Sequence, residues 1–105
     1  NEGEIEGFAR AGKFEETTVA LSLLCGLPIN AIEHAMVQDR PETILIVARA
    51  CGLSWLTAKA VLLLRSGKSG MSAQSLEQCM ADFTRLRRET AQQVVEFQRA
   101  RHMTG

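Results

Sequence analysis

The chain has 105 residues, of which 46% are hydrophobic and 23% charged, as expected for one globular domain with a buried core. Its 12 basic and 12 acidic residues cancel, so no overall charge draws it to nucleic acid or to a membrane surface. Aromatic residues make up only 5% of the chain, and no apolar run reaches the roughly 18 residues of a membrane-spanning segment. We therefore expect a soluble domain with an aliphatic core, which suits packed helices.

The start of the chain and its cysteines indicate its context. The chain begins at Asn1 rather than Met, so we expect it to be part of a longer protein, and its first residues do not form a secretory signal. Its 3 cysteines are odd in number, and none lies in a C-x-x-C pair. This pattern is typical of reduced thiols and predicts a cytoplasmic protein.

An internal repeat organises residues 14–65, after a Glu- and Gly-rich stretch (residues 1–13) that predicts a short, partly frayed lead-in helix. The phrase Cys-Gly-Leu at residues 25–27 recurs 26 residues later, at residues 51–53. Each copy consists of an apolar run, this break and a second amphipathic run, which predicts a helix-turn-helix unit used twice. Gly26 and Gly52 are expected to end the first helix of each unit with a left-handed backbone.

The first helix of each unit is strongly apolar. Residues 19–25 leave little polar face, so we expect this helix to be buried on most sides. Residues 43–51 are more apolar still, and their β-branched side chains also fit a buried strand, but the alignment with residues 17–25 favours a helix. The second helices are expected to start after Pro28 and after Ser54, which is a good N-cap residue.

The C-terminal third predicts a linker at residues 66–71 and helices over residues 72–103. Ser72 is expected to cap the first of these helices, and an interruption of the apolar pattern places a break near Leu86. The whole chain, residues 1–105, thus predicts a single α-helical domain of six to seven helices without strands. The fold class is all-α, as either a short HEAT-like α-solenoid or a compact antiparallel bundle.

A series of phrases resembles one bacterial family. In chain order they are TVALSLLCGLPI (residues 18–29), DRPETILI (39–46), ACGLSW (50–55), LLLR (62–65), FTRL (83–86) and TAQQVVEF (90–97). Together they resemble a domain family of unknown function, found chiefly in alphaproteobacteria and similar to HEAT-type helical repeats. The resemblance covers about residues 12–101. It implies an α-helical repeat domain in a cytoplasmic bacterial protein, and it supplies no catalytic residues.

The second unit also fits part of a DNA-binding helix-turn-helix. Ala48 and Gly52 match the start of that motif, whose recognition helix would begin near Ser54. Reading the major groove requires polar side chains at the front of this helix, where only Thr57 and Lys59 can contact bases or phosphates. Close helix packing explains the alanine, the glycine and the turn equally well. A DNA-binding regulator is therefore the alternative function.

No constellation of residues predicts catalysis, a metal or a cofactor. Glu15 and Glu16 are adjacent and so point to different parts of a helix surface. His34 and His102 are too far apart in sequence to give a metal-ligand spacing. We interpret the three cysteines as small buried thiols, with a redox role for Cys79, expected to be the most exposed of them, as an alternative. The chain is not expected to be an enzyme.

Charge is divided between the two ends of the chain. Residues 1–43 carry 8 acidic and 3 basic residues, and residues 44–105 carry 4 acidic and 9 basic residues. This asymmetry and the helical repeat predict a protein–protein interaction or scaffold module, bound to an unidentified protein or to a second copy of itself, without nucleic acid or membrane. The predicted binding residues flank the groove of the second helices or belong to a basic cluster: Glu33, Asp39, Lys59, Arg65, Arg85, Arg87 and Arg88.

Overall fold

The computed structural model describes residues 1–38 and 40–104, with the side chains of residues 68 and 102–104 left out. Seven α-helices occupy this part of the chain: α1 (Glu2–Arg10), α2 (Phe14–Cys25), α3 (Ile29–Val37), α4 (Glu42–Ala50), α5 (Trp55–Ser66), α6 (Ala73–Arg85) and α7 (Arg88–Thr104). A 3₁₀ turn, η1 (Gly67–Ser69), follows α5, and the described residues form no strand. The predicted all-α class and helix count are confirmed.

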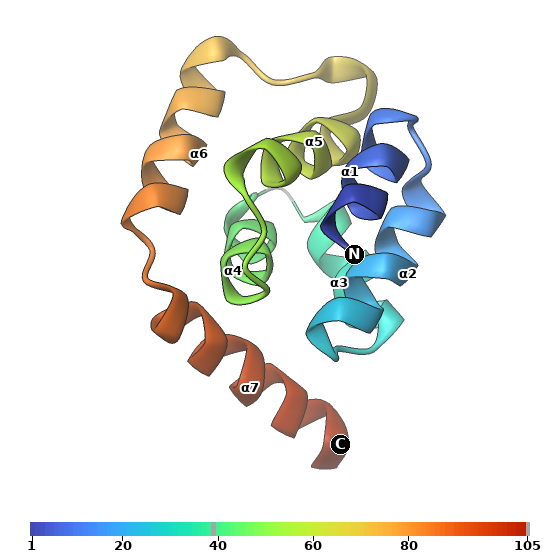
Figure 1. Ribbon diagram of the computed structural model, residues 1–105, viewed down its shortest axis with the longest axis vertical. Coiled ribbons are helices and arrows are strands. Elements are labelled where there is room, and N and C mark those ends of the chain that lie inside the picture. The colour runs from blue at the N-terminus through green and yellow to red at the C-terminus, as the bar shows by residue number, and fades with distance from the viewer. Residues whose placement is uncertain (39, 105) are drawn as a thin grey trace.

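Helices α4 and α5 lie at the centre of the fold (Figure 1). α1 packs against α2 and α5, α2 packs against α3, and α4 packs against α5, α6 and α7. In Figure 1, α6 and α7 follow one side of α4, and α1, α2 and α3 lie on the other side. The most deeply buried apolar side chains come from five helices: Ile5, Leu21, Ile32, Met36, Ile44, Val47, Val61 and Leu62. α6 and α7 add Phe83 and Val95 to this core.

The glycines of the two Cys-Gly-Leu turns both have a left-handed backbone. Gly26 has a φ of 74° and Gly52 a φ of 76°, so both occupy the left-handed region that only glycine adopts readily. Leu27 and Leu53, which follow them, are buried in the core at 6% and 4% exposure. The prediction of a left-handed glycine at the end of the first helix of each unit is confirmed.

The prediction that α2 is buried on most sides is wrong. Leu23 is 80% exposed and Val19 41% exposed, whereas Thr17, Thr18 and Ser22 are buried. The buried hydroxyls are satisfied by backbone carbonyls: Thr17 Oγ1 donates to Lys13 O (2.8 Å), Thr18 Oγ1 to Phe14 O (2.9 Å) and Ser22 Oγ to Leu27 O (2.5 Å). A hydroxyl that bonds a nearby backbone carbonyl loses little on burial. α2 therefore packs through a face that combines these hydroxyls with Leu21 and Cys25, and it leaves a second apolar face outside.

The C-terminal helices follow the sequence prediction closely. Ser54 and Ser72 cap α5 and α6, since each side-chain oxygen accepts a hydrogen bond from the backbone N–H three residues on. α6 ends at Arg85, and Leu86 adopts an extended backbone before α7 begins, which confirms the break. The segment predicted as a linker is short, because Ser66 still belongs to α5 and residues 67–69 form η1.

A carboxylate joins the first helix to the fifth. Glu2 Oε2 accepts hydrogen bonds from the backbone N–H of Ser54 (3.0 Å), from Ser54 Oγ (2.5 Å) and from Thr57 Oγ1 (2.6 Å). These bonds lower the pKa of Glu2, with the Ser54 hydroxyl as the largest cause. The negative charge also lies at the positive N-terminal end of α5. α1 is thus joined to α5, and its residues Ile5 and Ala9 lie in the core.

We predict that Gly52→Ala lowers the free energy of unfolding by roughly 1–2 kcal/mol, the usual cost of a left-handed residue with a Cβ. The added Cβ would also lie 3.0 Å from Nη2 of Arg88, which must then move. Gly12→Ala is the matched control. Gly12 also has a positive φ, 75°, but open space surrounds it, so this variant carries the backbone cost without the contact to an arginine. Thermal unfolding measures both, and a Gly52→Ala variant as stable as the parent would contradict this account of the turn.

We also predict that Glu2→Gln destabilises the domain near neutral pH. The folded-state pKa of Glu2 lies below its ordinary value of 4.5, so the stabilisation is complete above that value and is lost as the pH falls through the lowered pKa. The difference in unfolding free energy between the parent and Glu2→Gln should therefore shrink in acid. Urea unfolding over a pH series measures it. Glu6→Gln, which removes only a surface pair with Arg10, should show a smaller effect.

Candidate functional site

The exposed apolar face of α2 forms one wall of a groove, which we name the α1–α2 groove. It is lined by residues of both helices: Glu4, Phe8, Glu15, Glu16, Val19, Ala20 and Leu23. Its volume is about 570 Å³. Phe8 and Ala20 are half-buried, so the floor is apolar and Leu23 projects furthest into solvent. A contiguous exposed apolar surface with a polar rim is typical of an interaction site.

The rim of the α1–α2 groove is acidic. α1 and α2 run antiparallel (Figure 1), so the carboxylates that start each helix flank the apolar floor from opposite ends. Glu4 accepts a hydrogen bond from the amino group of Asn1 (2.9 Å). Glu15 and Glu16 form no ion pair with any residue that the structure describes. The groove therefore combines an apolar floor with the carboxylates of Glu15 and Glu16, which no described residue pairs.

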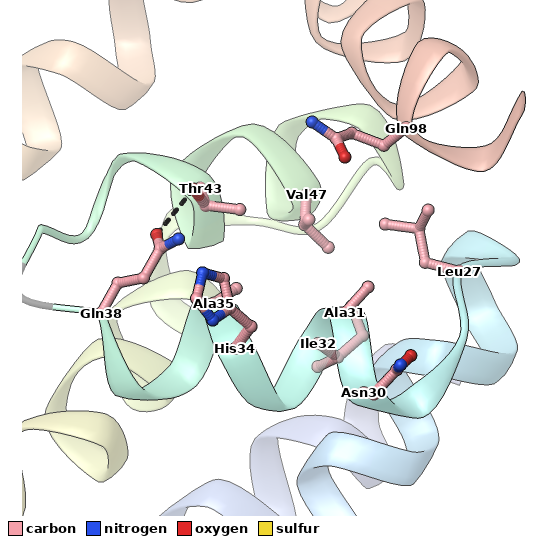
Figure 2. A pocket seen from close by; sticks show the side chains of 10 residues that line it. All are labelled: Leu27, Asn30, Ala31, Ile32, His34, Ala35, Gln38, Thr43, Val47 and Gln98. Carbon is pink, nitrogen blue, oxygen red and sulfur yellow. Dashed lines mark hydrogen bonds between the residues drawn. The ribbon is translucent and has the colours of Figure 1, made fainter. Parts of the chain in front are cut away.

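A second cleft lies between α3, α4 and α7, and Figure 2 shows its lining side chains turned toward one another. Its volume is about 390 Å³. The polar groups that line it are three amides, one hydroxyl and one imidazole: Asn30, Gln38, Gln98, Thr43 and His34. Thr43 Oγ1 donates to Gln38 Oε1 (3.1 Å). This lining offers hydrogen bonds to an uncharged ligand, but it contains neither paired carboxylates nor a nucleophile beside a base.

The two repeat cysteines meet in a third cleft of about 400 Å³, which we name the corner cleft. It is lined by the C-terminal ends of α2 and α4 and by one face of α7: Leu24, Cys25, Ala50, Cys51, Arg88, Gln92, Val95, Glu96 and Arg99. Arg99 Nη2 donates to the carbonyl oxygen of Cys25 (2.8 Å), and Gln92 Nε2 donates to that of Ala50 (3.4 Å). α7 thus supplies donors to the carbonyls at the ends of both helices.

The largest cause of the pKa shifts of Cys25 and Cys51 is a hydrogen bond between their thiols. This bond lowers the pKa of Cys25 to about 7 despite the opposing effect of burial, and the backbone at Leu27 and the charge of Arg99 also favour the thiolate. The same bond raises the pKa of Cys51, which therefore keeps its proton. Cys25 is thus the thiol of this pair that ionises near neutral pH.

Cys79 differs from the sequence prediction that it is the most exposed cysteine. It is buried on α6 at 4% exposure, and burial raises its pKa. Cys51 is the cysteine with intermediate exposure. α6 packs Cys79 and Phe83 inward together, four residues apart on one face.

The residues predicted to flank one groove are spread over different elements. Glu33 is exposed on α3, and Lys59 is half-buried on α5. Nη2 of Arg65 donates to the carbonyl oxygen of Gln38. Asp39 lies outside the described residues. Their binding role stays a prediction, since neither the structure nor a comparison tests it.

The predicted basic cluster is also divided. Arg85 pairs with Asp82 on the surface of α6 (2.9 Å), and Arg87 lies 3.9 Å from Glu89. Arg88 instead lies over the bare backbone of Gly52. Among the described residues, then, these arginines make separate local contacts.

Comparison with known proteins identifies a family. A model of DUF2336, described as an uncharacterised protein conserved in bacteria, matches residues 1–96. The chain belongs to the DUF2336 family. This confirms the resemblance to a bacterial family of unknown function. Neither a curated protein nor a solved structure matches the chain.

Two further properties of the DUF2336 domain concern the residues that the structure describes. None of the described helices has the length and apolar character needed to cross a bilayer. No group of three or more His, Cys, Asp or Glu side chains is placed to hold a metal ion in the described part of the chain.

The α1–α2 groove was missed from the sequence although its signal is present there. Glu15, Val19 and Leu23 recur every four residues and share one face of α2. Thr18 and Ser22 recur in the same way on another face. Hydropathy alone assigns the apolar face to the core, and only the hydroxyl-to-carbonyl bonds reverse that assignment.

We predict that iodoacetamide alkylates Cys25 at a rate that rises around pH 7, below the ordinary thiol value of 9.0. Cys51→Ala removes the hydrogen bond to the thiolate, so it should move this midpoint upward. Peptide mass spectrometry after timed alkylation measures each cysteine separately, with Cys79 as the internal control. An unchanged midpoint in Cys51→Ala would contradict the assignment of the thiol–thiol bond as the cause.

Proposed function

We propose that the DUF2336 domain is a protein-interaction module that binds a basic amphipathic helix of a partner protein in the α1–α2 groove. The observation that carries this proposal is the 80% exposure of Leu23 on a helix that buries Thr17 and Thr18. Full burial of a leucine side chain is worth about 1.5–3 kcal/mol. An apolar face exposed beside a polar face that is buried indicates a surface that a second molecule covers.

The shape and charge of the groove identify the kind of partner. Two antiparallel helices with an apolar floor accept a third helix, which lays its own apolar stripe between them. The carboxylates of Glu4, Glu15 and Glu16 favour Lys or Arg on the flanks of that stripe. Charged groups at the rim speed association and select the partner, and the apolar contacts supply most of the affinity.

Two other functions receive less support. For the DNA-binding alternative, the front of α5 is occupied, because the Glu2 carboxylate holds Ser54 and Thr57 where phosphates would approach. For catalysis, the cleft between α3, α4 and α7 offers amides, a hydroxyl and one imidazole. We propose a binding role without catalytic activity. The odd cysteine count still favours a cytoplasmic setting.

The test uses a synthetic helical peptide with leucines on one face and lysines on the other, labelled for fluorescence anisotropy. We expect binding that weakens as salt rises, because the Lys–Glu contacts are exposed. Leu23→Ser should weaken binding about tenfold or more, as expected for loss of a central apolar contact. Leu56→Ser is the matched control, since Leu56 is 60% exposed on α5, outside the groove. A peptide with glutamates in place of the lysines should bind poorly.

Equal loss of binding in Leu23→Ser and Leu56→Ser would show nonspecific binding to exposed apolar side chains and would contradict the proposal. Self-association is a separate outcome, because α7 exposes Val94 and Phe97 beside Arg101. Sedimentation of the domain alone detects it. A dimer that Leu23→Ser dissociates would make a second copy the occupant of the groove, in place of a partner protein.

A further inference from the structure

The corner cleft brings together two cysteines that the repeat places at equivalent positions. Cys25 is the last residue of α2, and Cys51 follows the last residue of α4. Both line the same cleft, and each thiol is the largest influence on the pKa of the other. Two cysteines that line one cleft from the ends of two helices are candidates for a covalent link, which forms when their Cα atoms lie within about 7 Å of each other.

The charged groups around the pair favour the anionic form of one sulfur. Arg88 and Arg99 of α7 line the cleft, and Glu96 is the acidic side chain that lines it with them. Both arginines lower the pKa of Cys51 against the stronger opposing effect of the Cys25 thiol. Arg99 lowers the pKa of Cys25 in the same direction as the Cys51 thiol does. A thiolate beside a protonated thiol and two guanidinium groups is typical of a reactive cysteine.

We infer that Cys25 and Cys51 form a redox pair that a peroxide converts to an intrachain disulfide. The sulfur of Cys25 attacks one oxygen of hydrogen peroxide, the O–O bond breaks, and the departing hydroxide takes up a proton to leave as water. Cys25 is then a sulfenic acid. The sulfur of Cys51 attacks the Cys25 sulfur, the S–O bond breaks, and a second water leaves with the proton of Cys51. Each sulfur gives up one electron, and the peroxide takes both.

The disulfide would close the loop of residues 25–51 and tie the end of α2 to the end of α4. A crosslink between two helix ends that line one cleft in the folded chain restricts the unfolded chain more than the folded one. The oxidised domain should therefore unfold at a higher temperature than the reduced domain. Cys79 takes no part, since it lies on α6 and does not line the corner cleft.

The test begins with Cys79→Ala, which leaves the pair as the remaining thiols. After treatment with hydrogen peroxide, the intact mass should fall by two hydrogen atoms, both thiols should disappear from a colorimetric count, and the protein should remain a monomer on a non-reducing gel. Adding Cys25→Ser or Cys51→Ser should abolish the mass loss. The fluorescence of Trp55, the single tryptophan, reports whether each variant is folded.

Three results would overturn the inference: persistence of both thiols in Cys79→Ala, disulfide-linked dimers, or oxygen added to Cys25 without a disulfide. The parent protein provides a test that does not depend on the variants. Native oxidation followed by trypsin should yield a crosslinked peptide that joins residue 25 to residue 51, and its absence would also overturn the inference.

Discussion

The left-handed turns at Gly26 and Gly52 are the constraint on which the arrangement of the helices depends. Each turn sends a leucine into the core and leaves a bare backbone on its outer side. Arg99 and Arg88 of α7 occupy those two bare surfaces, where a Cβ would lie only 3.2 Å and 3.0 Å from their nitrogens. Cations at the carbonyl ends of α2 and α4 are also favoured by the helix dipoles. The repeat thus provides two exposed glycine backbones in equivalent positions, and two arginines of α7 cover them.

Local features of this fold were predictable because each is decided by a few neighbouring residues. The glycine turns, the Ser54 and Ser72 caps and the break at Leu86 all follow from backbone chemistry within one or two helical turns. The all-α class and the family were also predictable, since both rest on the order of such features along the chain.

The candidate sites were not predictable in the same way, because they depend on which helices meet. No residue near Cys25 in the sequence predicts that its thiol interacts with that of Cys51. The repeat predicts that the two cysteines occupy equivalent positions, but not that they lie close together. The hydrogen bond between Glu2 and Ser54 was equally unpredictable, because the two residues are 52 positions apart in the sequence. The prediction that α2 is buried on most sides failed for another reason. Hydroxyls that bond carbonyls of the preceding turn are buried at low cost, and a hydropathy scale does not include this effect.

The packing of α1 on α5 also sets an order of events while the chain is being made. A ribosome releases α1 before α5, yet the apolar face of Ile5 and Ala9 has no α5 to cover it until the residues from Ser54 to Ser66 have emerged. During that interval the nascent chain carries an unburied apolar stripe, the kind of surface that chaperones recognise and that promotes aggregation. Contacts between segments so distant in sequence also slow folding. The packing of α1 therefore cannot be completed until α5 has been synthesised.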